Sequence, residues 1–274
     1  MTPILLVHGG AGDVPDERVE VKLAGVKKSV GIGYRILENG GSALDAVEAA
    51  VRCMEDDDAF NSGRGSCLNQ DGEVEMDASI MNGVNLSSGA VAVVKDIAHP
   101  ISLARLVMEK TPHILIAGAG ANRFAKEQGV PTLPPGSLVT KYEMESLRQI
   151  KEERHKTPEG GGTVGAVAID AKGNLAAATS TGGNKWENGH GETIARYCLA
   201  HSITKEMEYG KSAQQATEGC LKKMTERLKN TAGAITISGK GDVGIYFTTD
   251  RMSWAFRKGN ELHYGVEQDQ HILE

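Results

Sequence analysis

The chain has 274 residues, a formal net charge of −6, 34 glycines and only 4% aromatic residues. This length allows a sizeable core in one large domain or two closely packed halves, and the acidic balance argues against a nucleic-acid partner. No apolar run reaches the roughly 18 residues of a membrane span, and no basic region precedes the first apolar stretch as in a signal peptide. The four cysteines follow neither a metal-binding nor a secretory spacing. We therefore expect a soluble cytoplasmic protein with no membrane or nucleic-acid partner.

Glycine-rich loops separate the first elements. An apolar run at residues 4–7 predicts a strand that leads into His8-Gly9-Gly10-Ala11-Gly12. Such a loop is either a tight turn or a set of backbone N–H groups aimed at an anion. Apolar residues at spacings of three and four predict a helix over about 19–37, and Ser42 is a typical N-cap for a second helix. That helix ends in the acidic run 55–58, which we expect to be solvated, with cation binding as the alternative.

Alternating polarity predicts a half-buried strand over 73–80, in which Glu75 and Asp77 are either exposed or catalytic carboxylates. The charged stretch 141–157 is typical of an exposed helix or a linker. The other expected elements are strand 89–94, helix 101–111, strand 114–117, helix 118–128, strands 164–169 and 175–180, helices 192–208 and 212–228, strands 234–238, 243–248 and 252–256, and a short hairpin strand after 260. Because strands and helices come in blocks, the order favours an α+β fold of stacked layers.

Three glycines, Gly160-Gly161-Gly162, run directly into Thr163 and the apolar stretch 164–169. Glycine can take backbone conformations that are closed to other residues. One interpretation is a flexible linker that delivers the chain into a core strand. The other is a self-cleavage junction, at which Thr163 becomes the N-terminus of a new chain.

Six short motifs occur in one order along the chain. They are His8-Gly9-Gly10, Gly40-Gly41-Ser42-Ala43-Leu44-Asp45-Ala46-Val47, Phe60-Asn61-Ser62-Gly63-Arg64-Gly65-Ser66, Met76-Asp77-Ala78-Ser79-Ile80-Met81, Gly162-Thr163-Val164-Gly165-Ala166-Val167-Ala168 and Thr179-Ser180-Thr181-Gly182-Gly183. Together they closely resemble the plant-type asparaginase/isoaspartyl peptidases, a family of N-terminal-nucleophile (Ntn) hydrolases. The resemblance extends from residue 4 to 183 and again from 189 to the end.

The resemblance implies a four-layer αββα sandwich, made as one precursor and cut between Gly162 and Thr163. The products are an α-subunit, 1–162, and a β-subunit, 163–274, which together form one domain. Two such αβ heterodimers are expected to pair. The implied reaction is hydrolysis of L-asparagine and of isoaspartyl dipeptides, and it needs no cofactor.

A threonine hydroxyl is a weak nucleophile that needs a nearby base. Once Thr163 is freed, its own α-amine, with a reference pKa of about 7.7–8.0, can take the hydroxyl proton. By the resemblance, Thr181 hydrogen-bonds the nucleophile, Asn61 lies beside it, and Gly189 and Gly191 bind substrate.

The resemblance also implies a structural sodium ion. Its ligands would be backbone carbonyls of Met54, Glu55, Asp57, Phe60, Ser62 and Arg64.

The sequence departs from the family pattern after Gly183, where about thirty residues are missing and only 184–188 bridge the distance. This stretch of the family supplies an arginine and an aspartate that clamp the substrate, and one core strand. We therefore expect a core strand to be missing or replaced. Two functions follow: an active hydrolase, or a shortened and catalytically impaired relative that acts as a non-catalytic binding or interaction subunit.

Overall fold

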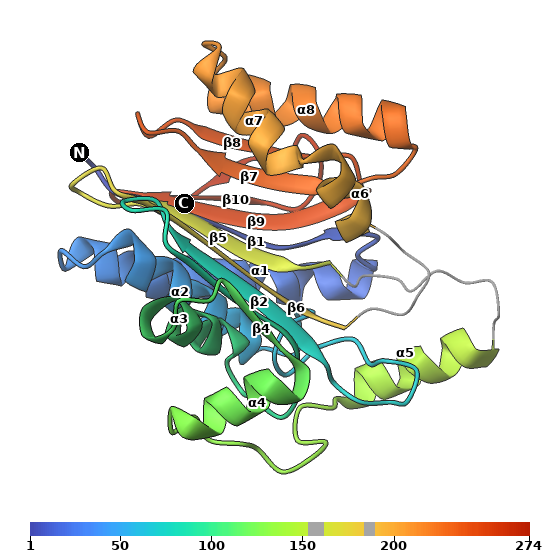
Figure 1. The fold of residues 1–274 in the computed structure, drawn as a ribbon. Helices are drawn as coiled ribbons and strands as arrows, with labels where there is room; N and C mark the ends of the chain where they lie inside the picture. Colours follow the sequence, from blue (N-terminus) through green and yellow to red (C-terminus); the bar gives the residue numbers. More distant parts are fainter. Residues whose placement is uncertain (153–161, 184–189) are drawn as a thin grey trace.

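The computed structural model describes residues 1–152, 162–183 and 190–274 (Figure 1). Its elements in chain order are β1 (Ile4–Gly12), α1 (Asp16–Glu38), α2 (Ala43–Glu55), β2 (Met76–Asn82), β3 (Ser88–Val94), α3 (Pro100–Lys110), β4 (Leu115–Ala117), α4 (Gly118–Glu127), α5 (Lys141–Glu152), β5 (Val164–Ile169), β6 (Leu175–Gly182), α6 (His190–Tyr197), α7 (Leu199–Glu208), α8 (Ala213–Leu228), β7 (Gly233–Ile237), β8 (Val243–Phe247), β9 (Arg251–Lys258), β10 (Glu261–Gly265) and β11 (Ile272–Leu273). Within these described ranges, every helix is too short or too polar to cross a bilayer.

A large mixed sheet forms the centre of the molecule. Its strand order is β11-β10-β9-β1-β5-β6-β2-β3-β4, and all neighbours are antiparallel except β3 and β4. The strand that carries Thr179 and Thr181, β6, pairs with β5 on one side and with β2 on the other. The expected loss of a strand has therefore not opened this sheet.

Two sets of elements cover opposite faces of the large sheet (Figure 1). On one face, α1 packs against β1 and β9, α2 against β5 and β6, and α3 against β2 and β3. On the other face lies a second sheet, in which the described residues form only two strands, β7 and β8. This small sheet contacts β1 and β5 through β7, and α8 covers its outer side. The fold is thus α+β, with helices on both outer sides.

Two local predictions need correction. The expected helix 192–208 is two helices, α6 and α7, because Cys198 lies between them in a left-handed conformation with φ 50°. The glycine-rich segment 8–12 continues strand β1 instead of forming a separate loop, although the pairing register with β9 shifts between His8 and Ala11.

The expectation that the acidic run 55–58 is solvated is wrong for Glu55, which is only 1% exposed. Its Oε1 accepts a hydrogen bond from the Ile101 N–H group at 3.0 Å, in the first turn of α3, and one from the Ser180 hydroxyl at 2.7 Å. A helix N-terminus is a favourable place for a carboxylate. Burial nevertheless raises the pKa of Glu55 to about 8, because burial disfavours the charged form.

Candidate active site

Gly162, the residue before Thr163, lies close to the glycine-rich end of β1. Gly10 has φ +99°, and a Cβ atom on it would lie 2.5 Å from the Gly162 carbonyl oxygen. A Cβ atom on Gly162 would lie 2.7 Å from both the backbone nitrogen and the oxygen of Ala11. The two backbones therefore approach so closely that neither position has room for a side chain. Gly162 therefore lies close against the backbone of Gly10 and Ala11.

The pairing of β5 with β6 places the threonines near one another. In this antiparallel pair, Val164 lies opposite Ser180. Thr163 comes just before Val164 and Thr181 just after Ser180, so the two threonines lie at the same end of the pair. The Thr179 hydroxyl donates to the Val164 carbonyl at 2.9 Å, which ties the two strands together next to the junction. Thr163 itself is partly buried.

Asn61 connects the loop after α2 to the end of β6. Its Nδ2 donates to the Thr181 hydroxyl at 3.5 Å, while its Oδ1 accepts from the N–H groups of Cys67 and Gly182 at 2.9 and 3.2 Å. The side chain is 4% exposed. These bonds fix the amide and place its N–H end at Thr181, so the structure brings Asn61, Thr181 and the Thr163 junction together.

His8 lies opposite Gly165, two residues after Thr163, in the pairing of β1 with β5. A Cβ atom on Gly165 would lie 2.5 Å from His8 Nε2. Its Nδ1 accepts a long hydrogen bond, 3.3 Å, from the Gly10 N–H group. Burial, with the positive charge of Lys22 as the second cause, lowers the pKa of His8 to about 4. The imidazole is therefore neutral near pH 7 and can keep accepting this bond.

Lys22 is a residue that the sequence analysis did not single out. It is 3% exposed, its Nζ donates to the Gly9 carbonyl at 3.1 Å, and it lies 5.2 Å from the centre of the Phe60 ring. Burial lowers the pKa of this amine to about 8. The sequence did carry one sign that Lys22 is buried. It lies three residues after Val19 and four before Val26, on the apolar face of α1.

The lowered pKa of His8 predicts a pH-dependent stability. The unfolded chain takes up the proton near pH 6.5, but the folded chain does so only near pH 4. The contribution of neutral His8 is therefore complete above pH 6.5 and is lost as the pH falls toward 4, by up to about 3 kcal/mol. In His8→Asn the amide oxygen can still accept from Gly10, but it does not titrate.

The measurement is the free energy of unfolding in urea, from pH 7 to 4, for both proteins. Their difference isolates His8 from the carboxylates that they share. We expect the wild type to lose more stability than the variant over this range, and parallel curves would contradict the assigned pKa.

The remaining candidate side chains and glycines are Gly189, Gly191 and the two carboxylates near β2. Gly189 lies outside the described residues, and Gly191 is in the first turn of α6. Of the two carboxylates in or beside β2, Glu75 lies 3.2 Å from Lys95 and Asp77 accepts from the Val93 N–H group at 2.7 Å. Asp77 thus anchors β3, where Val93 has φ 54°.

The loop expected to hold sodium closes on itself. Carbonyls of Glu55, Asp57 and Phe60 accept bonds from the N–H groups of Arg64, Phe60 and Ser62 at 2.8–3.1 Å. A carbonyl has a second lone pair, so these bonds leave room for a cation. Ser62 Oγ is buried without a hydrogen-bond partner among the described residues. The same ranges hold no group of three histidine, cysteine or acidic side chains suited to a metal, so a cation here would depend on carbonyls.

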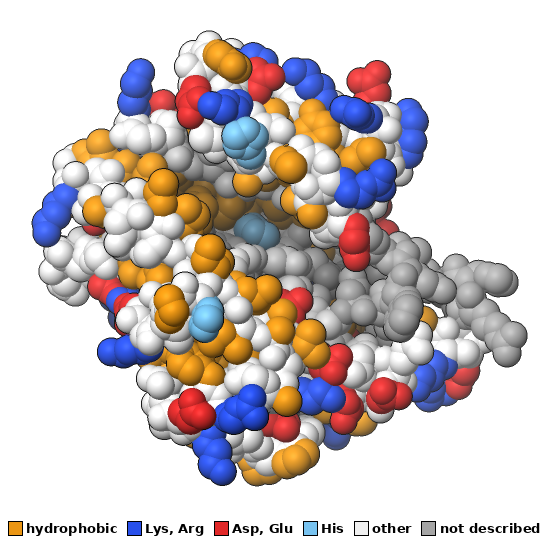
Figure 2. Space-filling model, in the orientation of Figure 1, with side chains coloured by type: hydrophobic (Ala, Val, Ile, Leu, Met, Phe, Trp, Pro, Cys, Tyr) orange, Lys and Arg blue, Asp and Glu red, His pale blue; other side chains and the backbone are white. Residues whose placement is uncertain are grey.

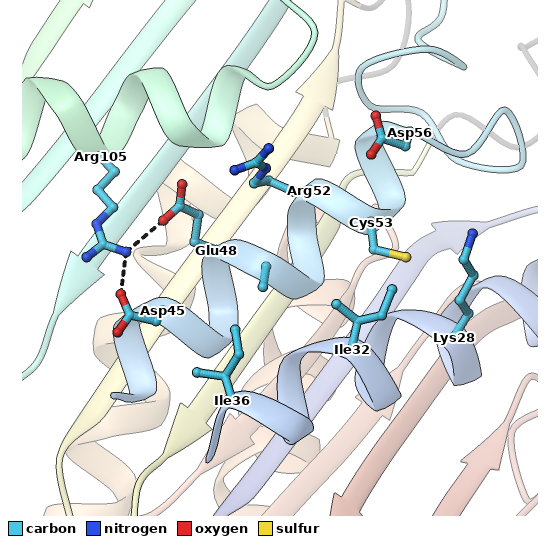
Figure 3. Close-up of a pocket in the computed structure, with 10 residues that line it drawn as sticks. Lys28, Ile32, Ile36, Asp45, Glu48, Arg52, Cys53, Asp56 and Arg105 are labelled. Atoms are coloured by element: carbon cyan, nitrogen blue, oxygen red, sulfur yellow. Dashed lines mark hydrogen bonds and ion pairs between the residues drawn. The ribbon is translucent and has the colours of Figure 1, made fainter. Parts of the chain in front are cut away.

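A cavity of about 470 Å³ between α1 and α2 is separate from this site (Figure 3). Part of its charged wall is paired, because Arg105 contacts Asp45 at 2.6 Å and Glu48 at 2.7 Å. Neither Thr163 nor Thr181 lines it. We therefore do not assign it a part in the chemistry.

Comparison with known proteins identifies the family of the chain. A sequence model of the family described as asparaginase matches residues 1–188 and 187–266. The isoaspartyl peptidase/L-asparaginase of Xenopus laevis is 45% identical over 295 positions, covering 97% of this chain and 96% of the relative. The human protein of the same name is 44% identical over 300 positions, covering 98% and 97%. That of Danio rerio is 41% identical over 309 positions, covering 100% and 98%.

The break in the family match falls at residues 187–188, where the sequence analysis places the missing stretch. The alignment of 295 positions with the Xenopus protein covers only 97% of a 274-residue chain, so about 29 positions have no counterpart here. The match nevertheless spans almost the whole chain and includes Asn61, Thr163 and Thr181. The chain therefore belongs to the asparaginase family.

Proposed function

We propose that the chain cuts itself before Thr163 and then hydrolyses L-asparagine and isoaspartyl dipeptides with the freed threonine. The observation that carries this proposal is the close approach of Gly10 to the Gly162 carbonyl, directly before Thr163 and at the same end of β5 and β6 as Thr181. The relatives' shared name, isoaspartyl peptidase/L-asparaginase, supports the substrate class.

In the maturation step, Thr163 Oγ attacks the Gly162 carbonyl carbon. A C–O bond forms, the Gly162-Thr163 amide C–N bond breaks, and the hydroxyl proton passes to the leaving amine. Water then hydrolyses the ester, leaving a carboxylate on Gly162 and a free amino terminus on Thr163. Holding the carbonyl in a fixed place favours this step, because the reacting atoms need not find each other.

In the turnover step, the Thr163 amine accepts the hydroxyl proton as Oγ attacks the side-chain amide or the isoaspartyl bond of the substrate. Ammonia or an amino acid leaves with that proton, and water hydrolyses the aspartyl ester to free aspartate. Thr181, oriented by Asn61, is suited to hydrogen-bond Thr163 Oγ and to favour one direction of attack.

The proposal includes the processed architecture. Subunits 1–162 and 163–274 would remain together, because β5 of the second subunit pairs with β1 of the first on one side and is linked through β6 to β2 on the other. Helices, large sheet, small sheet and helix succeed one another through the molecule (Figure 1), which supports the four-layer αββα arrangement. Pairing of two αβ heterodimers remains a prediction.

A structural sodium ion is part of the same proposal. Carbonyls of Met54, Glu55, Asp57, Phe60, Ser62 and Arg64 would hold it, and the ion would stiffen the loop that carries Asn61.

A second function is a non-catalytic interaction subunit, and the break at residues 187–188 favours it. The clamp expected there orients both charges of an amino-acid substrate, and orientation contributes much of catalysis.

Substrate hydrolysis by the purified chain separates the two functions. Ammonia release from L-asparagine and amino-acid release from a β-aspartyl dipeptide are measured after incubation for self-cleavage, with Thr163→Ala as the blank. We expect release above the blank, with low affinity because the clamp is absent. Complete cleavage with rates equal to the blank would instead assign the non-catalytic role.

A further inference from the structure

The outer edge of β7 carries backbone groups that no other described strand pairs with. At the two ends of its pairing with β8, the Thr248 N–H group donates to the Ala232 carbonyl and the Ser238 N–H group donates to the Asp242 carbonyl. The backbone N–H and C=O groups of the even-numbered residues of β7 therefore point toward β8. In an antiparallel pair this pattern alternates. The N–H and C=O groups of Gly233, Ile235 and Ile237 therefore point away from β8. Among the described residues, β7 pairs with no strand other than β8.

The opposite edge of the small sheet is protected. The Gln214 amide donates to the Ile245 carbonyl at 3.0 Å and accepts from the Ile245 N–H group at 2.8 Å, as a neighbouring strand would. The Gln268 amide donates to the Phe247 carbonyl. Side chains that occupy an edge in this way hinder pairing with another strand. The β8 edge is thus covered by side chains, whereas no described strand pairs with the outer edge of β7.

The outer edge of β7 faces an uncovered part of the large sheet. Since β7 lies over β1 and β5, the next strand beyond its edge is β6. On the α2 side of β6, Ala176 and Ala178 are 5% and 6% exposed. On the other side Ala177 is exposed, and so is Met81, opposite it on β2, at 41%. A central strand is normally covered on both faces when its residues are apolar.

We call this hollow the β7 groove. Its wall is the edge formed by Gly233, Ile235 and Ile237, and its floor is formed by Leu175, Ala177 and Met81. The space-filling view shows the surface hollowed between the α7–α8 layer and the β2–β4 side, with hydrophobic side chains along it (Figure 2).

We propose that the β7 groove binds an extended strand of another polypeptide, which pairs with β7 and lays alternate apolar side chains on the floor. The outward N–H and C=O groups of β7 match a strand of about five residues, the length of β7. The alignment with the Xenopus laevis relative contains about 29 positions that this chain lacks, and the family match breaks at 187–188, just before α6. That length is enough for one strand with its loops. The three floor residues are apolar and carry no charge, so the partner strand is apolar and not acidic.

The probe is a fluorescent synthetic peptide of the stretch that the Xenopus laevis relative carries at the break, and its binding to the full chain is measured by anisotropy. Ile235→Pro removes an outward N–H group without touching the β8 ladder, and Ile235→Ala is its control because it keeps that group. Ala177→Lys places a charge on the exposed floor, and Ala200→Lys does the same on exposed α7. Thermal unfolding shows that each variant folds.

We expect saturable binding by the wild type, at least about tenfold weaker binding by Ile235→Pro and Ala177→Lys, and nearly unchanged binding by Ala200→Lys. Ile235→Ala should bind clearly better than Ile235→Pro. No binding by the folded wild type, or equal binding by Ala177→Lys, would overturn the proposal. A dimeric wild type that ignores the peptide and becomes monomeric in Ala177→Lys would show that a second copy fills the groove, and would also overturn it. Because the readout is binding, the test is independent of hydrolysis.

Discussion

Replacing Thr163 by alanine is expected to leave the chain as one polypeptide of 29.1 kDa and to remove hydrolysis. The hydroxyl of Thr163 is the group proposed to attack both the Gly162 carbonyl and the substrate, and loss of a catalytic nucleophile lowers rates by at least about 10³-fold. Denaturing gels over time and the ammonia assay measure the two effects.

Thr163→Ser is the matched control, because it keeps the hydroxyl and removes only a methyl group. We expect the serine variant to cleave, more slowly than the wild type, and to retain some hydrolysis. If the alanine variant were cut at the same bond and at the same rate as the serine variant, Thr163 would not be the maturation nucleophile.

The second large effect is expected for Gly10→Ala. Its φ of +99° is unfavourable for a residue with a side chain, and the new Cβ atom would meet the Gly162 carbonyl oxygen at 2.5 Å. Because that oxygen belongs to the backbone, no side-chain rotation relieves the contact. We expect cleavage to slow by more than about tenfold through misplacement of the Gly162 carbonyl, with a loss of about 1–3 kcal/mol in the free energy of unfolding.

Gly173→Ala separates backbone strain from contact with the junction. Gly173 has a similar φ, +85°, in the turn between β5 and β6, and a Cβ atom there would meet nothing within 4 Å. This variant should lose stability by about 1–2 kcal/mol but cleave at the normal rate. Equal slowing in both variants would mean that the close approach of Gly10 to Gly162 does not position the bond.

Much of the fold was predictable because local patterns and tertiary packing agree. The period-two pattern identified β2, and the small-residue runs identified β5 and β6, although the bounds shifted by a few residues. The break between α6 and α7 was not predictable, because Cys198 adopts a left-handed backbone conformation. Residues other than glycine seldom take this conformation, and the sequence gives no reliable sign of it. Sequence also could not show the order of strands in the two sheets, since strand order depends on contacts far apart in the chain.

The candidate site was predictable to the extent that motifs name its residues. The resemblance pointed to Thr163, Thr181 and Asn61, and the structure brings them to one end of β5 and β6. The burial of Glu55 was missed because its partner, the first turn of α3, lies 46 residues away. Lys22 was missed for a similar reason. A lysine in a helix is expected to be exposed, and the partner that buries Lys22, the Gly9 carbonyl, is known only from the structure.

The most direct test of the account is the identity of the N-terminus produced by incubating the purified wild-type chain. N-terminal sequencing and intact-mass measurement should give a new chain that begins Thr163-Val164-Gly165 and ends at residue 274, together with one that ends at Gly162. An uncut chain after prolonged incubation, or a new terminus within 153–161, would contradict self-cleavage by Thr163.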